Sequence, residues 1–321
     1  MKRLRVAAPM ILAAATAAFV PQPLAAQSWP ARPVTLVVTF AAGGPTDGIA
    51  RLLANELSEK IGQRVVVENR GGAGGNIGAA SAAKAPADGY TLLMVSSGPG
   101  AVNKLIYKTL SYDPLKDFAP VVMVANVPTV ILASPKLPVA DLKDVVAYGK
   151  RNPNKLNVGN AGYGTGGHIA AVLFADKASI ALTHVPYRGV GPMLTDIISG
   201  QIELGFAGFV PQVRNMKALA VTAATRSRVL PDIPTVREAT GLDVVGGVWY
   251  GLLAPTGTPR HIIDRVNATV NDFFKTTRGM AAGESIGMEP VGGTPEEMGA
   301  LMAHDIERLA PVIRGAKISI D

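Results

Sequence analysis

Short apolar runs alternate with helix-period segments along most of the chain. The first run, Val34–Phe40, is rich in β-branched residues and short enough for a buried strand. The turn at Gly43–Gly44 ends it, and apolar residues then recur at helical spacing from Ile49 to Leu57. The same pattern predicts strands over 64–68 and 90–96 with a helix over 76–84 between them. Such alternation indicates a parallel sheet built from βαβ units.

The alternation restarts after Phe118–Ala133, two apolar runs divided at Asn126 and Pro128, which we interpret as a crossing into a second lobe. The apolar stretch Val244–Ala254 is the candidate return crossing. Between the crossings the pattern predicts helices over 140–151, 168–177 and 192–199, a short helix near 211–216, a loop with one helical turn over 226–240, and strands over 156–159, 182–186, 202–206 and 218–223. Helices over 260–274 and 295–314 return to the first lobe.

The predicted fold is therefore α/β with two lobes, each a mixed, mainly parallel sheet flanked by helices, joined by two crossing segments. Lobe 1 takes residues 27–125 and 254–321, and lobe 2 takes residues 126–253. Two such lobes would enclose a cleft that closes by hinge motion around a ligand, which suggests a solute receptor.

Residues 1–26 have the pattern of a secretory signal peptide. Three cations, Lys2, Arg3 and Arg5, precede a short apolar run, and the small residues before Gln27 predict cleavage near Ala26 and export of the mature chain. The 321 residues contain no Cys, so no disulfide is available. The net charge of +7 includes the three leader cations, the other basic residues are scattered, and aromatic residues make up only 5%, which argues against nucleic acid as a partner.

Two glycine-rich turns carry the candidate chemistry. Gly43–Asp47 and Gly162–Gly167 each follow a predicted strand and precede a helix, with Thr46, Asp47 and Thr165 as polar residues at the helix starts. Free N–H groups at a helix N-terminus hold anions, and glycine lets a ligand approach bare backbone. Two such loops, one from each lobe, would face each other across the cleft. The alternative is that each turn only starts a helix, with Asp47 as a cap.

Other sites are poorly supported by the residues. Gly162–Gly167 satisfies the dinucleotide pattern, but the next strand ends in Tyr187–Arg188 without the acidic residue that NAD requires. For His168, a role in fixing the loop is favoured over general base or metal ligand, because the four histidines have no zinc spacing. No serine elbow, cysteine nucleophile or phosphate-loop lysine is present, so we expect no catalytic residue, metal or cofactor. Arg188 either pairs with a second carboxylate or is a solvated cation, and Trp249 and Tyr250 are more typical of core or hinge packing.

Many stretches together resemble the extracytoplasmic solute receptors of the tripartite tricarboxylate transporter family, also called the Bug family. The resemblance runs collinearly from Trp29 to the C-terminus. The segments that carry it are Trp29–Pro33, Gly43–Asp47, Val66–Gly78, Asp88–Leu92, Tyr112–Pro114, Asp117–Pro120, Gly164–Thr165 with His168, His184–Gly189, Ala218–Thr222, Leu230–Thr235, Gly251–Pro255 and Pro290–Glu297.

The resemblance implies a two-lobed periplasmic binding protein of the type II kind that is not an enzyme and acts as a monomer. It would hold a small organic carboxylate and deliver it to a membrane permease formed by two partner subunits. Carried over by position, the loops Phe40–Asp47 and Asn160–His168 grip the proximal carboxylate with backbone N–H groups, the Thr165 hydroxyl and bound water, while Tyr187–Gly189 shapes the distal end. The candidate ligand-binding residues are Phe40, Ala42, Gly43, Gly44, Thr46, Asp47, Ser96, Ser97, Gly162, Gly164, Thr165, Gly166, His168, Tyr187 and Arg188.

The sequence departs from the family pattern at several positions. Ala41–Ala42 stands where family members usually have prolines, Gly166 where Ser is frequent, and Ala207–Gly208 where an Asp-Asn pair is common, and the segment up to Ala218 is shorter. Our hypothesis is that the pocket favours a larger, less polar carboxylate over a zwitterionic amino acid. Two other functions stay open: an exported hydrolase that uses Asp47 and His168, and a ligand-presenting sensor component that acts on a membrane kinase.

Overall fold

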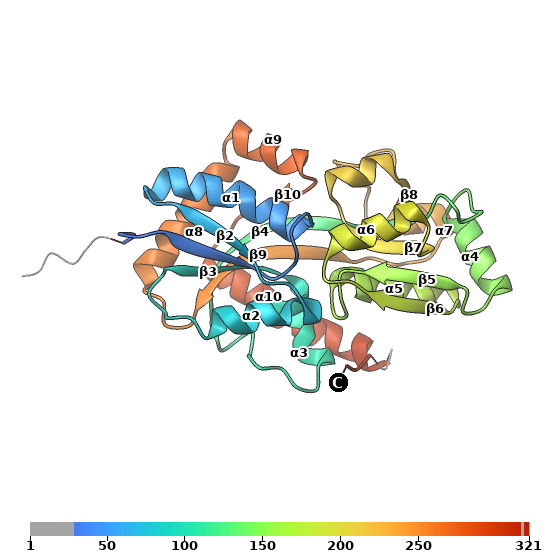
Figure 1. The fold of residues 1–321 in the computed structure, drawn as a ribbon, viewed down its shortest axis with the longest axis horizontal. Coiled ribbons are helices and arrows are strands. Elements are labelled where there is room, and N and C mark those ends of the chain that lie inside the picture. The colour runs from blue at the N-terminus through green and yellow to red at the C-terminus, as the bar shows by residue number, and fades with distance from the viewer. Residues whose placement is uncertain (1–28, 316–317, 321) are drawn as a thin grey trace, which may run out of the picture.

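In the part of the chain that the structure describes, ten strands form one sheet (Figure 1). The computed structural model describes residues 29–315 and 318–320, so the predicted leader and its cleavage site near Ala26 lie outside the described residues. The main path of the sheet has the order β2-β1-β3-β9-β4-β7-β5-β6, and β8 and β10 each pair with β4. The strands are β1 Val34–Val38, β2 Val65–Asn69, β3 Thr91–Ser96, β4 Phe118–Ala133, β5 Leu156–Asn160, β6 Leu182–Pro186, β7 Leu204–Gly208, β8 Lys217–Val221, β9 Gly247–Pro255 and β10 Glu289–Pro290.

Helices cover both parts of this sheet (Figure 1). They are α1 Pro45–Ile61, α2 Asn76–Ala83, α3 Asn103–Ile106, α4 Leu142–Arg151, α5 Gly166–Ala178, α6 Val190–Ser199, α7 Val236–Thr240, α8 Arg260–Phe274, α9 Thr277–Ser285 and α10 Pro295–Gly315. Short helical turns occupy Ala73–Gly75, Gly98–Val102 and Pro211–Asn215. The apolar residues that recur at helical spacing in the sequence form the buried face of α1. Ile49, Leu53 and Leu57 are 1%, 0% and 1% exposed.

The predicted parallel pairing is found at both ends of the sheet. Strand β1 pairs in parallel with β2 and β3, and β5 pairs in parallel with β6 and β7. The antiparallel pairs come from the crossing strands, since β9 pairs with β3 and β4, and β4 pairs with β7, β8 and β10. The sheet is therefore mixed, with helix-flanked parallel strands on either side of an antiparallel centre.

The crossing read as two apolar runs is one strand of 16 residues, β4. The break predicted at Asn126 and Pro128 does not interrupt it. Asn126 is the exposed position of β4. Pro128 pairs with Gly247, the first residue of β9, and the next residue, Thr129, pairs with Gly208 of β7. Proline has no N–H to donate to a ladder, and it is tolerated here because β4 passes at this point from one partner strand to another.

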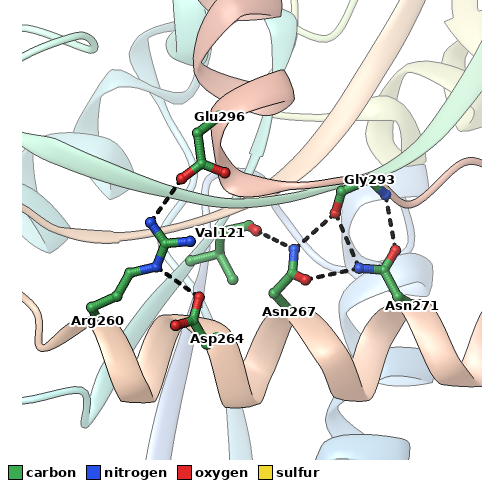
Figure 2. A network of polar contacts seen from close by, with 7 residues as sticks. All are labelled: Val121, Arg260, Asp264, Asn267, Asn271, Gly293 and Glu296. Atoms are coloured by element: carbon green, nitrogen blue, oxygen red, sulfur yellow. Dashed lines mark hydrogen bonds and ion pairs between the residues drawn. The ribbon is translucent and has the colours of Figure 1, made fainter.

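The C-terminal elements return to the first half through a polar network on α8 (Figure 2). Asn267 donates to the carbonyls of Val121 in β4 and Gly293 at 2.8 Å each, and Asn271 accepts from the Gly293 N–H at 2.9 Å. Arg260 pairs with Asp264 on its own helix and with Glu296 at the start of α10. These contacts fix α8 against β4 and against the turn that leads into α10.

Several local features differ from the sequence prediction, including strand β7, which is found at Leu204–Gly208 where residues 202–206 were predicted. Helix α5 begins at Gly166, two residues before the predicted start, because Thr165 is its N-cap. Helix α9 and strand β10 were not predicted, since Gly279 and Gly283 have low helix propensity. Their tertiary setting compensates: the Thr276 hydroxyl accepts from the Gly279 N–H at 3.0 Å, and both glycines lie against neighbouring side chains or backbone that a Cβ would strike.

Candidate functional site

A small cavity lies where the N-termini of α1 and α5 meet. Its volume is about 30 Å³, which is enough to hold water. Residues from both halves of the chain surround it, although they are more than a hundred positions apart in the sequence. The lining consists of Phe40, Gly44, Pro45, Thr46, Ser96, Ala161, Thr165, Gly166, Gly167, Val190, Phe206, Ala207, Gly208, Val248 and Tyr250.

The first loop leads from β1 into α1. Gly43 has φ +87°, a left-handed conformation that favours glycine, and Gly44 is the N-cap in extended conformation. Pro45 is the first helical residue, where its missing N–H has no intrahelical partner to lose. The first bond of the turn is the Gly48 N–H to the Gly44 carbonyl at 3.0 Å. The Thr46 N–H therefore lies in the first turn without an intrahelical acceptor.

Asp47 braces this loop from behind instead of facing the cavity. Its carboxylate accepts from the Gly43 N–H, from the Arg51 guanidinium and from the Asn69 side-chain amide, at 3.0 to 3.1 Å. Burial alone would raise the pKa of Asp47, but the hydrogen bonds from Arg51, Gly43 and Asn69 together hold it below its ordinary value. Asn69 also donates to the Phe40 carbonyl at 3.0 Å. The Asp47 carboxylate therefore holds the loop directly at Gly43 and, through Asn69, at Phe40.

The second loop leads from β5 into α5. The Thr165 hydroxyl donates to the Gly162 carbonyl at 2.7 Å and accepts from the His168 N–H at 3.4 Å. The Thr165 hydroxyl proton is therefore bonded within the loop, so toward a ligand the hydroxyl oxygen can act only as an acceptor. Gly166 and Gly167 form the first turn of α5, where N–H groups have no intrahelical acceptor. A Cβ on Gly167 would lie 2.2 Å from the Phe206 carbonyl oxygen, so only glycine fits this approach.

His168 holds the second loop together. Its Nδ1 accepts from the Gly164 N–H at 3.2 Å, and its ring lies edge-on to Tyr163 and to His184, with centroids 5.2 and 4.9 Å away. Burial, with a smaller contribution from His184, lowers the pKa of His168 from 6.5 to about 4. The ring is neutral at pH 7, and Nδ1 is free to accept. This agrees with the favoured interpretation from the sequence, a role in fixing the loop.

Tyr250 is the polar cavity residue that the sequence did not point to. It lines the cavity, and burial raises the pKa of its hydroxyl. The sequence shows Tyr250 only as part of an apolar crossing. Tyr250 reaches the site because it lies on β9, which pairs with β4. Its hydroxyl oxygen lies close to Gly208 of β7, since a Cβ built on that glycine would be 3.2 Å from it.

The two loops are in direct contact with the opposite half of the molecule. The Ala41 N–H donates to the Arg188 carbonyl at 3.4 Å, and the Tyr107 hydroxyl donates to the Tyr163 carbonyl at 3.2 Å. Gly44 faces Val190 of α6, since a Cβ built on the glycine would be 3.7 Å from the valine Cβ. With these contacts formed, the cavity between the two loops is small.

Six of the predicted site residues line the cavity: Phe40, Gly44, Thr46, Ser96, Thr165 and Gly166. The other nine do not line it, namely Ala42, Gly43, Asp47, Ser97, Gly162, Gly164, His168, Tyr187 and Arg188. Of these nine, Ala42, Gly43 and Arg188 are exposed. The Tyr187 hydroxyl donates to Asp196 at 2.6 Å, and burial together with that carboxylate raises the pKa of Tyr187 to about 12.

Nine lining residues are absent from the list of candidate ligand-binding residues: Pro45, Ala161, Gly167, Val190, Phe206, Ala207, Gly208, Val248 and Tyr250. Three of them, Pro45, Ala161 and Gly167, lie within the two loops predicted to grip the ligand. Gly167 carried a usable signal, because it belongs to the glycine loop at the start of α5. Most of the others are apolar residues of strands, whose sequence pattern is the same whether they face a core or a cavity. Within residues 29–315 and 318–320, no group of three or more His, Asp or Glu is arranged to hold a metal ion.

The sequence model of the tripartite tricarboxylate transporter family receptor matches residues 49–318. The chain belongs to this receptor family. The resemblance read from the sequence motifs is therefore confirmed, and the family is one of periplasmic solute receptors. In the part of this receptor that the structure describes, no helix is both long and apolar enough to cross a bilayer.

Relatives of this receptor match it over almost their whole length. The protein BugT of Bordetella pertussis is 36% identical over 92% of this chain and 93% of its own. The structure of Rpa4515 of R. palustris with adipate has a TM-score of 0.88 and 38% identity, and covers 91% of this chain and 99% of its own. MatC from Rhodopseudomonas palustris with bound malate has a TM-score of 0.82 and 34% identity, and covers 89% and 100%.

Proposed function

We propose that this receptor binds one small organic carboxylate between the starts of α1 and α5 and delivers it to a tripartite tricarboxylate-type membrane permease. The observation that carries the proposal is the meeting of two helix N-termini, from opposite halves of the chain, at one cavity. Each helix start presents N–H groups without intrahelical acceptors and the positive end of a helix dipole. A carboxylate between them would accept from both. The structures of relatives with adipate and with bound malate support a carboxylate as the ligand.

The candidate grip consists mainly of main-chain groups. Gly44 and Thr46 belong to the first loop and Gly166 and Gly167 to the second, and all four line the cavity. The remaining predicted ligand contacts, which do not line it, act in this proposal as supports: Asp47 and His168 hold the two loops in shape through Gly43 and Gly164. The Thr165 hydroxyl oxygen would accept a hydrogen bond from a water on the ligand, because its own proton is donated to Gly162.

Ligand entry requires the two halves to separate. We propose the lobes expected from the sequence, residues 27–125 with 254–321 and residues 126–253, as the units that move, with the strands β4 and β9 as the hinge. Both strands pass between the two parts of the sheet (Figure 1). The contacts of Ala41 with Arg188 and of Tyr107 with Tyr163 would break on opening and form again on closure. The receptor is proposed to act as a monomer.

The geometry favours a receptor over the hydrolase alternative. Asp47 is paired with Arg51 and does not line the cavity, and His168 uses Nδ1 to hold the Gly164 N–H. Neither group is placed to activate water at a bound acid. A ligand-presenting sensor would use the same cavity, and copurification with a permease or with a membrane kinase distinguishes the two roles.

The test is calorimetric titration of the purified protein with a panel of small carboxylic acids and their amides. We expect at least one acid to bind and its amide to bind at least tenfold more weakly, because the amide lacks the charge that the helix ends stabilise. Gly44→Leu places a side chain in the cavity without backbone strain and should abolish binding. Gly48→Leu is the matched control, since a Cβ there meets nothing within 4 Å. Equal affinity for acid and amide would refute the proposed grip, and mass spectrometry should return the acid unaltered.

A further inference from the structure

A cluster of apolar side chains, separate from the cavity lining, joins the two proposed lobes. Its buried members are Val102, Ile106, Ile169, Leu309 and Ile313, and Leu105, Tyr107, Leu173, Ile318 and Ile320 are partly buried against them. Ile169 and Leu173 belong to α5, within residues 126–253. The other described members belong to residues 27–125 and 254–321. We call this set the inter-lobe cluster.

Helix α5 has buried residues on two of its faces. Ala170, Ala171 and Phe174 belong to the core of their own half of the chain. Ile169 is 7% exposed but belongs to the inter-lobe cluster, and Leu173 packs against both clusters. Because residues four positions apart lie on one side of a helix, Ile169 and Leu173 form a continuous apolar edge of α5. Separation of the lobes would expose Ile169 to water.

The other side of the inter-lobe cluster is held together within a single lobe. Ile106 is at the end of α3, and Leu309 and Ile313 are in the last turns of α10. The Ile320 N–H donates to the Ile106 carbonyl at 2.7 Å, and the Ile320 carbonyl accepts from the Lys108 N–H at 3.0 Å. These bonds join the end of the chain to α3, so this apolar surface does not depend on α5 for its shape.

The same surface also touches the second glycine loop. A Cβ built on Gly164 would strike the Ile106 side chain, so the loop lies directly against α3. The Tyr107 hydroxyl donates to the Tyr163 carbonyl at 3.2 Å. The inter-lobe cluster therefore forms together with the contact that brings the second loop, and with it the start of α5, to the opposite lobe.

We propose that the inter-lobe cluster is a closing contact, which is buried when the lobes meet, is exposed when they separate, and supplies part of the free energy with which this receptor retains its ligand. This inference rests on the proposed function. Burial of apolar surface favours the closed state whatever acid is bound, because the hydrophobic effect is not directional. The apparent affinity scales with the fraction of the receptor in the binding-competent state. Ile106, Ile169 and Leu309 would then set affinity from outside the cavity.

Leu309→Ala tests the apolar part of this contact. We expect an acid that binds the wild type in the calorimetric panel to dissociate about tenfold faster from the variant, with association changed by less than about twofold. Leu301→Ala is the matched control, because Leu301 lies on the same helix but packs in the cluster around Met298 and Trp249. Urea denaturation checks that both variants are folded. Equal dissociation rates in Leu309→Ala and Leu301→Ala overturn this inference and leave the proposed function standing.

Tyr107→Phe tests the polar part with a smaller change. The ring stays in the cluster, and only the hydroxyl that reaches the Tyr163 carbonyl is lost, so we expect dissociation to become about threefold to tenfold faster. Tyr148→Phe is the matched control, since Tyr148 packs on the core of the other lobe, and its dissociation rate should equal that of the wild type. An unchanged rate in Tyr107→Phe would refute a role of this bond in closing. If no acid of the panel binds the wild type, the proposed function and this inference fail together.

Discussion

Lowering the pH from 7 to 5 should destabilise this receptor through one buried histidine. His168 is 4% exposed, and its Nδ1 accepts a hydrogen bond from the Gly164 N–H in the second loop. Protonation would remove that acceptor and place a positive charge beside His184, whose own pKa burial lowers. The perturbation we propose is His168→Asn, because an asparagine oxygen can take the place of Nδ1 as the acceptor and does not titrate.

The size of the effect follows from the difference between the two pKa values of His168. The folded value is about 4 and the unfolded value 6.5, so between these pH values the unfolded chain binds more protons than the folded one. Stability is therefore fully present above pH 6.5 and is lost as the pH falls toward 4. One pKa unit corresponds to about 1.4 kcal/mol, which gives a loss of roughly 2 kcal/mol at pH 5 and about 3 kcal/mol at pH 4.

The assay is urea denaturation at pH 7 and pH 5, followed by circular dichroism, for the wild type, His168→Asn and His261→Asn. His261 lies on the exposed face of α8 and serves as the control for removal of an imidazole. We expect the wild type and the control to lose the same free energy of unfolding, and His168→Asn to lose about 2 kcal/mol less. Equal losses in all three proteins would refute the assignment of a neutral, buried His168.

Three further substitutions test the supports of the site and of the core. Asp47→Ala leaves the Gly43 N–H and the Asn69 amide without their acceptor and should cost about 2–4 kcal/mol in urea denaturation, whereas the exposed Asp243→Ala should cost less than about 1 kcal/mol. Gly167→Ala forces a Cβ against the Phe206 carbonyl and should lower the melting temperature and weaken carboxylate binding at least tenfold; full binding would contradict the close approach. Trp249→Phe removes the 2.6 Å bond to the buried Asp305 carboxylate and should cost about 1–3 kcal/mol of unfolding free energy, with an unchanged midpoint as the contrary result.

The sequence determined the features that depend on short stretches of chain. Apolar periodicity located most strands and the long helices, and the bounds predicted for α8 are those found. The glycine turns before α1 and α5 were read as helix starts, and both are helix starts. These features are local: a strand, a cap or a tight turn is favoured by residues within a few positions of one another, so they are visible without the fold. The motif order also sufficed to predict the family.

The tertiary structure decided which residues share the cavity. Thr46 and Thr165 were predicted and line it, but Asp47 and His168 turn away and hold the loops from behind. Tyr250, interpreted as core or hinge packing, and Val248, predicted only as part of the return crossing, reach the cavity because β9 lies between β3 and β4. An apolar strand residue has the same sequence signature in a core and beside a ligand, and only the packing of distant segments separates the two. The chain thus encoded the two helix starts locally, while their meeting at one small uncharged cavity depends on contacts between residues more than a hundred positions apart.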